Sequence, residues 1–109
     1  MLSYLGSPIQ PSTPPAPFFP RTLSQGLKGK DVTLLQRVLN ADPMTRIASQ
    51  GTGSPGHESD YFGALTKKAV EKFQVKHGIA TPGNAGYGTA GPKTRAKLQE
   101  VALALHIHP

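Results

Sequence analysis

The feature that most constrains the fold is a sequence motif typical of the start of a helix, which occurs twice, 28 residues apart. The chain reads FGALTKKAVEKFQVKH at residues 62–77 and AGPKTRAKLQEV at residues 90–101. This offset places Gly63 on Gly91, and the threonine and apolar positions that follow also coincide. Glycine can begin a helix, and a first-turn threonine can hydrogen-bond exposed backbone groups. Each copy therefore predicts the entry and packing face of an amphipathic helix.

A third amphipathic stretch precedes both copies. Its apolar residues recur at helical spacing, and Pro43 disfavours helical geometry before it, so this helix is predicted to end near residues 40–42. The second helix is predicted to close at Gly78, and the third to begin at Gly91-Pro92. The expected apolar positions of the three helices are Val32, Leu34, Leu35, Val38, Leu39, Leu65, Ala69, Val70, Phe73, Leu98, Val101, Ala102 and Leu105.

These patterns predict an all-α fold for the chain of 109 residues, a compact three-helix bundle with two long Gly-rich interhelical loops. An extended Pro-rich N-terminal tail is expected before it, because residues 7–20 contain six prolines. We divide the chain into a linker or tail over residues 1–21, a domain over 22–105 and a C-terminal end over 106–109. Residues 45–48 are a candidate short strand in the first loop.

Composition excludes several classes of function. The absence of cysteine excludes disulfides, thiolate metal sites and thiol catalysis. No stretch approaches the roughly 18 apolar residues of a membrane helix, and the N-terminus lacks the basic start of a signal peptide. Twelve Lys and Arg against six Asp and Glu give a net charge of +6, which suits anionic polymers in general. Nucleic-acid binding would require basic residues interleaved with exposed aromatics, so we expect none.

The sequence offers no catalytic or metal constellation. Glu58 and Asp60 lie in a flexible loop, whereas a glycosidase needs two carboxylates held across a cleft by a rigid scaffold. His57 adds a third potential metal ligand, but the spacing is loose and no fourth ligand is implied. The chain is therefore not expected to be an enzyme, to bind a metal or to need a cofactor.

The ordered set of motifs resembles a known family. The residues that carry the resemblance are Leu23, Gly26, Gly29, Asp31, Val32, Leu35, Gln36 and Leu39, then Phe62, Gly63, Thr66, Ala69, Val70, Phe73 and Gln74, then Gly78, Ile79, Gly91, Thr94 and Leu98. Together they resemble the three-helix peptidoglycan-binding domain found beside bacterial cell-wall hydrolases, over roughly residues 22–105. The chain departs from the family before the second helix, where Ser59-Asp60-Tyr61-Phe62-Gly63 replaces the usual Asp-Gly-x-Phe-Gly.

The resemblance implies non-catalytic binding of peptidoglycan, through its stem peptide or an amino sugar. It also implies that the domain targets an attached or associated protein to the wall, in the cell envelope or outside a bacterial cell. The alternative is a protein–protein assembly or adaptor module that reuses the same fold, with the Pro-rich tail as its docking segment.

Four residues are candidate ligand contacts: Tyr61, Gln74, Tyr87 and Thr89. The tyrosines precede the two helix entries and can offer flat faces to sugar rings, or cap the small core instead. Gln74, like Gln36, can present its amide to a ligand or satisfy loop backbone. We expect these residues to line one shallow groove between the helix entries and the two long loops.

Overall fold

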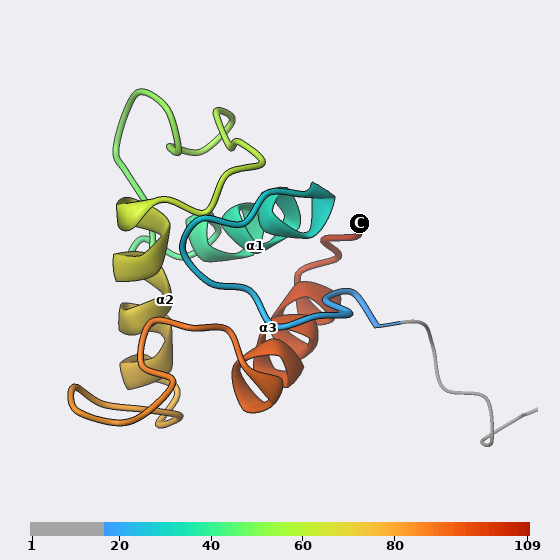
Figure 1. Ribbon diagram of the computed structural model, residues 1–109. Helices are drawn as coiled ribbons and strands as arrows, with labels where there is room; N and C mark the ends of the chain where they lie inside the picture. The colour runs from blue at the N-terminus through green and yellow to red at the C-terminus, as the bar shows by residue number, and fades with distance from the viewer. Residues whose placement is uncertain (1–16) are drawn as a thin grey trace, which may run out of the picture.

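A computed structural model describes residues 17–109 and places three helices in that range (Figure 1). They are α1 (Lys30–Asn40), α2 (Ala64–Lys76) and α3 (Pro92–Ala104). The predicted all-α three-helix fold is confirmed, since no strand occurs in residues 17–109 beyond two isolated bridges. Most of the predicted Pro-rich tail, residues 1–16, lies outside the described residues.

The ends of the helices follow the predicted local signals. Gly63 and Gly91 directly precede α2 and α3, and Pro92 is the first residue of α3. Gly78 follows α2 with a φ of 67°, in the left-handed region that glycine enters without steric cost. The strand predicted at residues 45–48 is wrong. The Thr45 hydroxyl instead donates to the Leu39 carbonyl at 2.7 Å, which closes the end of α1.

Helix α1 forms the centre of the core, because it packs against both α2 and α3 (Figure 1). Two predicted core positions are wrong: Leu65 is 52% exposed and Leu105 is 50% exposed. Leu65 lies on the apolar face of α2 that the helical period predicts, but its side chain lines a cavity instead of packing in the core. Leu105 follows the last helical residue, so the helical period no longer aims it inward. The buried apolar residues are Phe19, Leu23, Val32, Leu34, Leu35, Val38, Leu39, Ile47, Phe62, Ala69, Val70, Phe73, Ala90, Leu98 and Ala102.

Residues 17–29, here called the N-terminal arm, cross the molecule and join both helix entries (the blue segment of Figure 1). Leu23 and Ala90 exchange backbone hydrogen bonds of 3.2 and 2.8 Å. The Phe62 amide donates to the Leu27 carbonyl at 2.9 Å. Phe62 and Ala90 directly precede the entry glycines of α2 and α3. The arm therefore fixes the starting points of both helices.

The packed structure extends past the expected domain limits of 22–105. Phe19, in the arm, is only 2% exposed and belongs to the core. The Phe18 amide donates to the Gln99 side chain at 3.0 Å. Beyond α3, Ile107 packs against the core as a half-buried residue. Both ends of the described chain thus contribute to the folded unit.

The two ends meet beside α1. The rings of Phe18 and His108 contact edge to face with centroids 6.2 Å apart, and Arg37 of α1 donates to the His108 carbonyl at 2.9 Å. Nearby, Arg21 pairs with Asp31 in the first turn of α1 at 2.8 Å. The hydrogen bond from Arg21 lowers the pKa of the Asp31 carboxyl, with a smaller opposing effect from burial. Within residues 17–109, no helix has the length and apolar character to cross a membrane.

Candidate functional site

Gln36, on α1, fastens the first loop onto the entry of α2. Its side chain is 1% exposed, so both ends of the amide need protein partners. The Oε1 atom accepts a hydrogen bond from the Ser59 amide at 2.6 Å. The Nε2 atom donates to the Tyr61 carbonyl at 2.8 Å and to the Thr66 hydroxyl at 3.2 Å. One buried side chain thereby joins a helix, a loop and the first turn of the next helix.

Gln74, on α2, makes the same arrangement with the second loop and α3. Its Oε1 atom accepts from the Gly88 amide at 2.8 Å. Its Nε2 atom lies 2.9 Å from the Thr89 carbonyl, 3.1 Å from the Gly86 carbonyl and 3.1 Å from the Thr94 hydroxyl. Both ends of the side-chain amide are therefore bonded to protein groups, mostly loop backbone.

The loop carbonyls and threonine hydroxyls that accept from the two glutamines obey the 28-residue offset, whereas Gln36 and Gln74 themselves lie 38 residues apart in the sequence. The equivalent pairs are Tyr61 and Thr89, Gly63 and Gly91, and Thr66 and Thr94. Thr66 and Thr94 were predicted to hydrogen-bond backbone groups in the first turns of α2 and α3. This prediction is wrong, because neither helix has a side-chain cap. Both threonine hydroxyls instead accept from a glutamine amide. The sequence repeat therefore marks two similar connections, which we call joints. In each joint a buried glutamine, Gln36 or Gln74, bonds the loop before the next helix and a threonine in its first turn, Thr66 or Thr94.

A cavity of about 270 Å³ lies at the joint before α2, and we call it the α2 cavity. Its wall combines backbone of the first loop with the first turn of α2. The lining residues are Gln36, Ile47, Thr52, Gly53, Ser59, Tyr61, Gly63, Ala64, Leu65 and Thr66.

A larger cavity of about 590 Å³ lies at the joint before α3, and we call it the α3 cavity. It is formed by the second loop and the first turn of α3. The lining residues are Gln74, Ile79, Ala80, Asn84, Ala85, Gly86, Thr89, Gly91, Pro92, Lys93 and Thr94.

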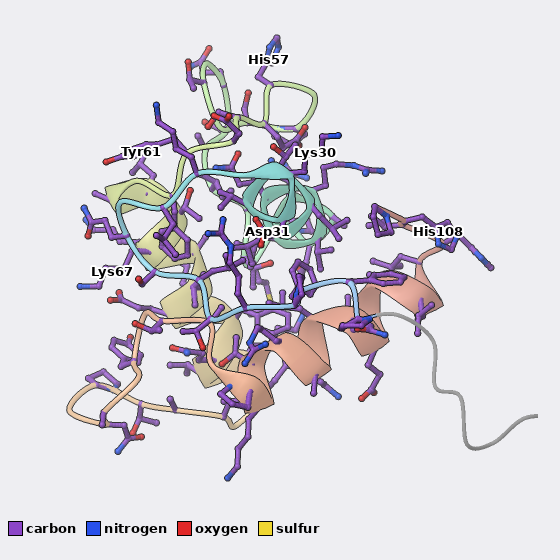
Figure 2. The ribbon with its side chains drawn as sticks, turned by 45° about the vertical axis from the view of Figure 1, so that its right-hand side comes forward. Lys30, Asp31, His57, Tyr61, Lys67 and His108 are labelled. Carbon is purple, nitrogen blue, oxygen red and sulfur yellow. The ribbon has the colours of Figure 1, made fainter. Side chains whose placement is uncertain are left out.

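The four sequence-predicted contacts do not lie together in one groove. Tyr61 lines the α2 cavity, is 45% exposed and projects from the α2 end of the molecule, on the side away from His108 (Figure 2). Gln74 and Thr89 line the α3 cavity. Tyr87 is half-buried and lines neither cavity. By the 28-residue offset, the residue equivalent to Tyr61 is Thr89, not Tyr87. The exposed edges of the two cavities, here called their rims, therefore carry different side chains.

Two lining residues, Leu65 and Lys93, were missed as candidate contacts. They occupy the same position in the two joints, one residue before the bonded threonine. The 28-residue offset was a signal that could have found them, because it aligns these positions directly. Helical periodicity had instead assigned Leu65 to the core.

The acidic loop before α2 has a structural role at Glu58. The Asn40 side-chain amide donates to the Glu58 carboxylate at 2.8 Å, and the Gly56 amide donates at 3.2 Å. Burial raises the pKa of Glu58, but these hydrogen bonds, a further one from its own backbone and the charge of Arg37 together outweigh burial, so the pKa is lowered. His57 is exposed and points away from the helices (Figure 2). Across residues 17–109, no three His, Asp or Glu side chains converge as a metal site.

Comparison with known proteins supplies one match. The family model described as "Putative peptidoglycan binding domain" matches residues 28–98, more than half of the chain. The matched range includes α1, α2, both glutamine joints and the first turns of α3. Searches of curated proteins and of solved structures find no significant match to the chain.

Proposed function

Because the chain belongs to the peptidoglycan-binding domain family, we propose that it binds cell-wall peptidoglycan without catalysis and holds an attached or associated protein at the bacterial wall. The observation that carries this proposal is the family match, which spans both joints and every lining residue of both cavities. The proposed location is the cell envelope or the outside of the cell.

The proposed contacts divide between the cavities. Tyr61 offers an exposed ring at the α2 cavity, and Thr89 offers a hydroxyl at the α3 cavity. Gln74 acts through its hold on the second loop, because its amide is already bonded to protein groups. Tyr87 lies in the same loop and is proposed to contact ligand that extends beyond the α3 cavity.

The cavity walls support binding rather than hydrolysis. Cleaving a glycosidic bond generally requires two carboxyl groups on either side of the scissile bond. Neither cavity is lined by Asp, Glu or His among the described residues. Both walls are built mainly from apolar groups, hydroxyls, amides and backbone, with the Lys93 ammonium group in the α3 cavity, which suits recognition of a sugar or peptide surface.

Retention on purified insoluble peptidoglycan tests the proposal. The full chain should sediment with the wall polymer at moderate salt, and Tyr61→Ala with Thr89→Ala should reduce the bound fraction several-fold. Lys68→Met is the matched control, because Lys68 is exposed on α2 and lines neither cavity. Absence of retention by the unmodified chain, or an equal loss in the control, would contradict specific wall binding.

The alternative proposal is an assembly module. A cavity of about 720 Å³ beside the start of the N-terminal arm favours it, with Pro17, Phe18, Leu34 and Pro109 in its wall. If this alternative holds, removing residues 1–16 should abolish capture of the associated protein while wall retention by the isolated chain stays absent. Retention that survives this truncation supports the wall-binding proposal instead.

A further inference from the structure

We propose that the two cavities bind different chemical groups of the same wall polymer. In this proposal, which rests on the proposed function, the α2 cavity binds the N-acetylated sugar and the α3 cavity binds the acidic stem peptide. The two joints share a glutamine, an entry glycine and a threonine, but residues at other equivalent positions of their walls differ.

The shared frame makes the differences informative. Each cavity is bordered by a buried glutamine, an entry glycine and a bonded threonine in matching positions. Three lining positions break the match: Tyr61 corresponds to Thr89, Ala64 to Pro92, and Leu65 to Lys93. The pairs Tyr61–Thr89 and Leu65–Lys93 change the chemistry of the wall most. One rim is therefore aromatic and aliphatic, and the other is hydroxylic and cationic.

The α2 cavity has the chemistry of a sugar-ring site. No charged residue is among its lining groups. Tyr61 and Leu65 are both about half exposed, although side chains of this kind gain free energy from leaving water. A pyranose ring presents apolar C–H faces, and an N-acetyl group presents a methyl, so both can cover these side chains. The Ser59 hydroxyl in the same wall can hydrogen-bond a sugar hydroxyl.

The α3 cavity has the chemistry of a carboxylate-bearing peptide site. Lys93 is its one charged lining residue, and no Asp or Glu lines it. Lys93 is exposed, and no acidic side chain in residues 17–109 forms an ion pair with it. An ammonium group in this position can donate to a peptide carboxylate with a charge-assisted hydrogen bond. The α3 cavity is also the larger of the two, with about 590 Å³ against about 270 Å³.

The position of Lys93 is unfavourable for the helix itself. It lies in the first turn of α3, where the helix dipole disfavours a positive charge. The first turn of α3 contains no acidic residue to offset that charge. Replacing Lys93 with methionine should therefore leave the thermal midpoint unchanged or raise it. A loss of ligand binding in this variant would then not come from unfolding.

The experiment is an NMR titration of the full chain with two separate probes, an N-acetylglucosamine tetrasaccharide and an acidic stem tetrapeptide without sugar. We expect the tetrasaccharide to shift the backbone amides of residues 63–66. We expect the tetrapeptide to shift those of Gly91, Lys93 and Thr94. Shifts from both probes at the same cavity would overturn the division between the cavities.

Three variants sharpen the test. Lys93→Met should weaken tetrapeptide binding about tenfold, the scale of one charge-assisted contact, and leave tetrasaccharide binding unchanged. Leu65→Lys should weaken tetrasaccharide binding and create tetrapeptide shifts at residues 63–66. Lys68→Met removes the same charge outside both cavities and should change neither titration.

The outcomes separate this inference from the proposed function. If the chain sediments with peptidoglycan but Lys93→Met weakens both probes equally, the division is wrong and wall binding stands. An equal effect of Lys68→Met on the tetrapeptide would show a response to net charge alone and would also overturn the division. If the chain does not sediment with peptidoglycan at all, the proposed function itself fails.

Discussion

At the scale of single residues, Gln36 and Gln74 connect elements that are distant in sequence through side-chain hydrogen bonds. Each is almost fully buried and satisfies its amide with loop backbone and a threonine hydroxyl. A buried amide that loses such partners leaves several polar groups unsatisfied. Removing either amide should therefore lower the free energy of unfolding, even where the apolar packing is kept.

Gln74→Met, which keeps the side-chain length and removes the amide, tests this role. We expect it to lower the free energy of unfolding by about 2–3 kcal/mol, because the Gly88 amide and the Thr89 carbonyl lose a buried partner. Urea denaturation measures the change. Gln25→Met, at an exposed position, should stay within about 0.5 kcal/mol. Equal effects in the two variants would show that the Gln74 joint adds no stability.

At the scale of elements, the N-terminal arm contributes to the core together with the helices, although it has no regular structure. It brings Phe19 and Leu23 into the core and hydrogen-bonds the residues before both helix entries. Because α2 and α3 contact each other less than each contacts α1, the arm supplies a second connection between their starting points. A three-helix description alone omits this part of the packing.

Phe19→Ala tests the contribution of the arm to the core. We expect a loss of about 3 kcal/mol in the free energy of unfolding, the usual cost of deleting a buried phenyl ring. Phe18→Ala is the matched comparison, because Phe18 is its neighbour and is only half-buried. Its cost should be clearly smaller in the same denaturation measurement. If both changes cost the same small amount, the arm is not an integral part of the core.

At the scale of the whole molecule, hydrogen bonds from the joints and the arm connect both long loops to the packed helices. The first loop is held by Gln36, and the second by Gln74. Loops are usually the first parts of a protein to open. Here the segments that line the cavities should instead open together with the core, which keeps the cavity walls in a fixed geometry before ligand binds.

Native-state hydrogen exchange measures this coupling. The amides of Ser59 and Gly88, which donate to the glutamines, should exchange as slowly as core helical amides such as that of Leu35. The Gly83 amide has no protein acceptor within residues 17–109 and should exchange fast. Fast exchange at Ser59 and Gly88 would show that the loops open independently of the core.

The sequence alone determined the three helices, most of their boundaries and the correspondence between the two joints. Gly63, Pro92 and Gly78 act through the geometry of their own backbone, so their effects are readable without a partner surface. The 28-residue offset also identifies equivalent positions from the sequence alone. The offset predicted a repeated local structure, and the full ordered set of motifs predicted the family resemblance, which the family match confirms.

Only the tertiary structure decided where the side chains of these elements point and what they face. It buried Phe19 from the expected linker, exposed Leu65 from the expected core, and directed Gln74 to loop carbonyls. It also divided the expected single groove into two cavities. The physical reason is that local conformation depends on neighbouring residues, whereas burial depends on which distant surfaces meet. Periodicity gives a helix its face, but the fold decides what that face contacts.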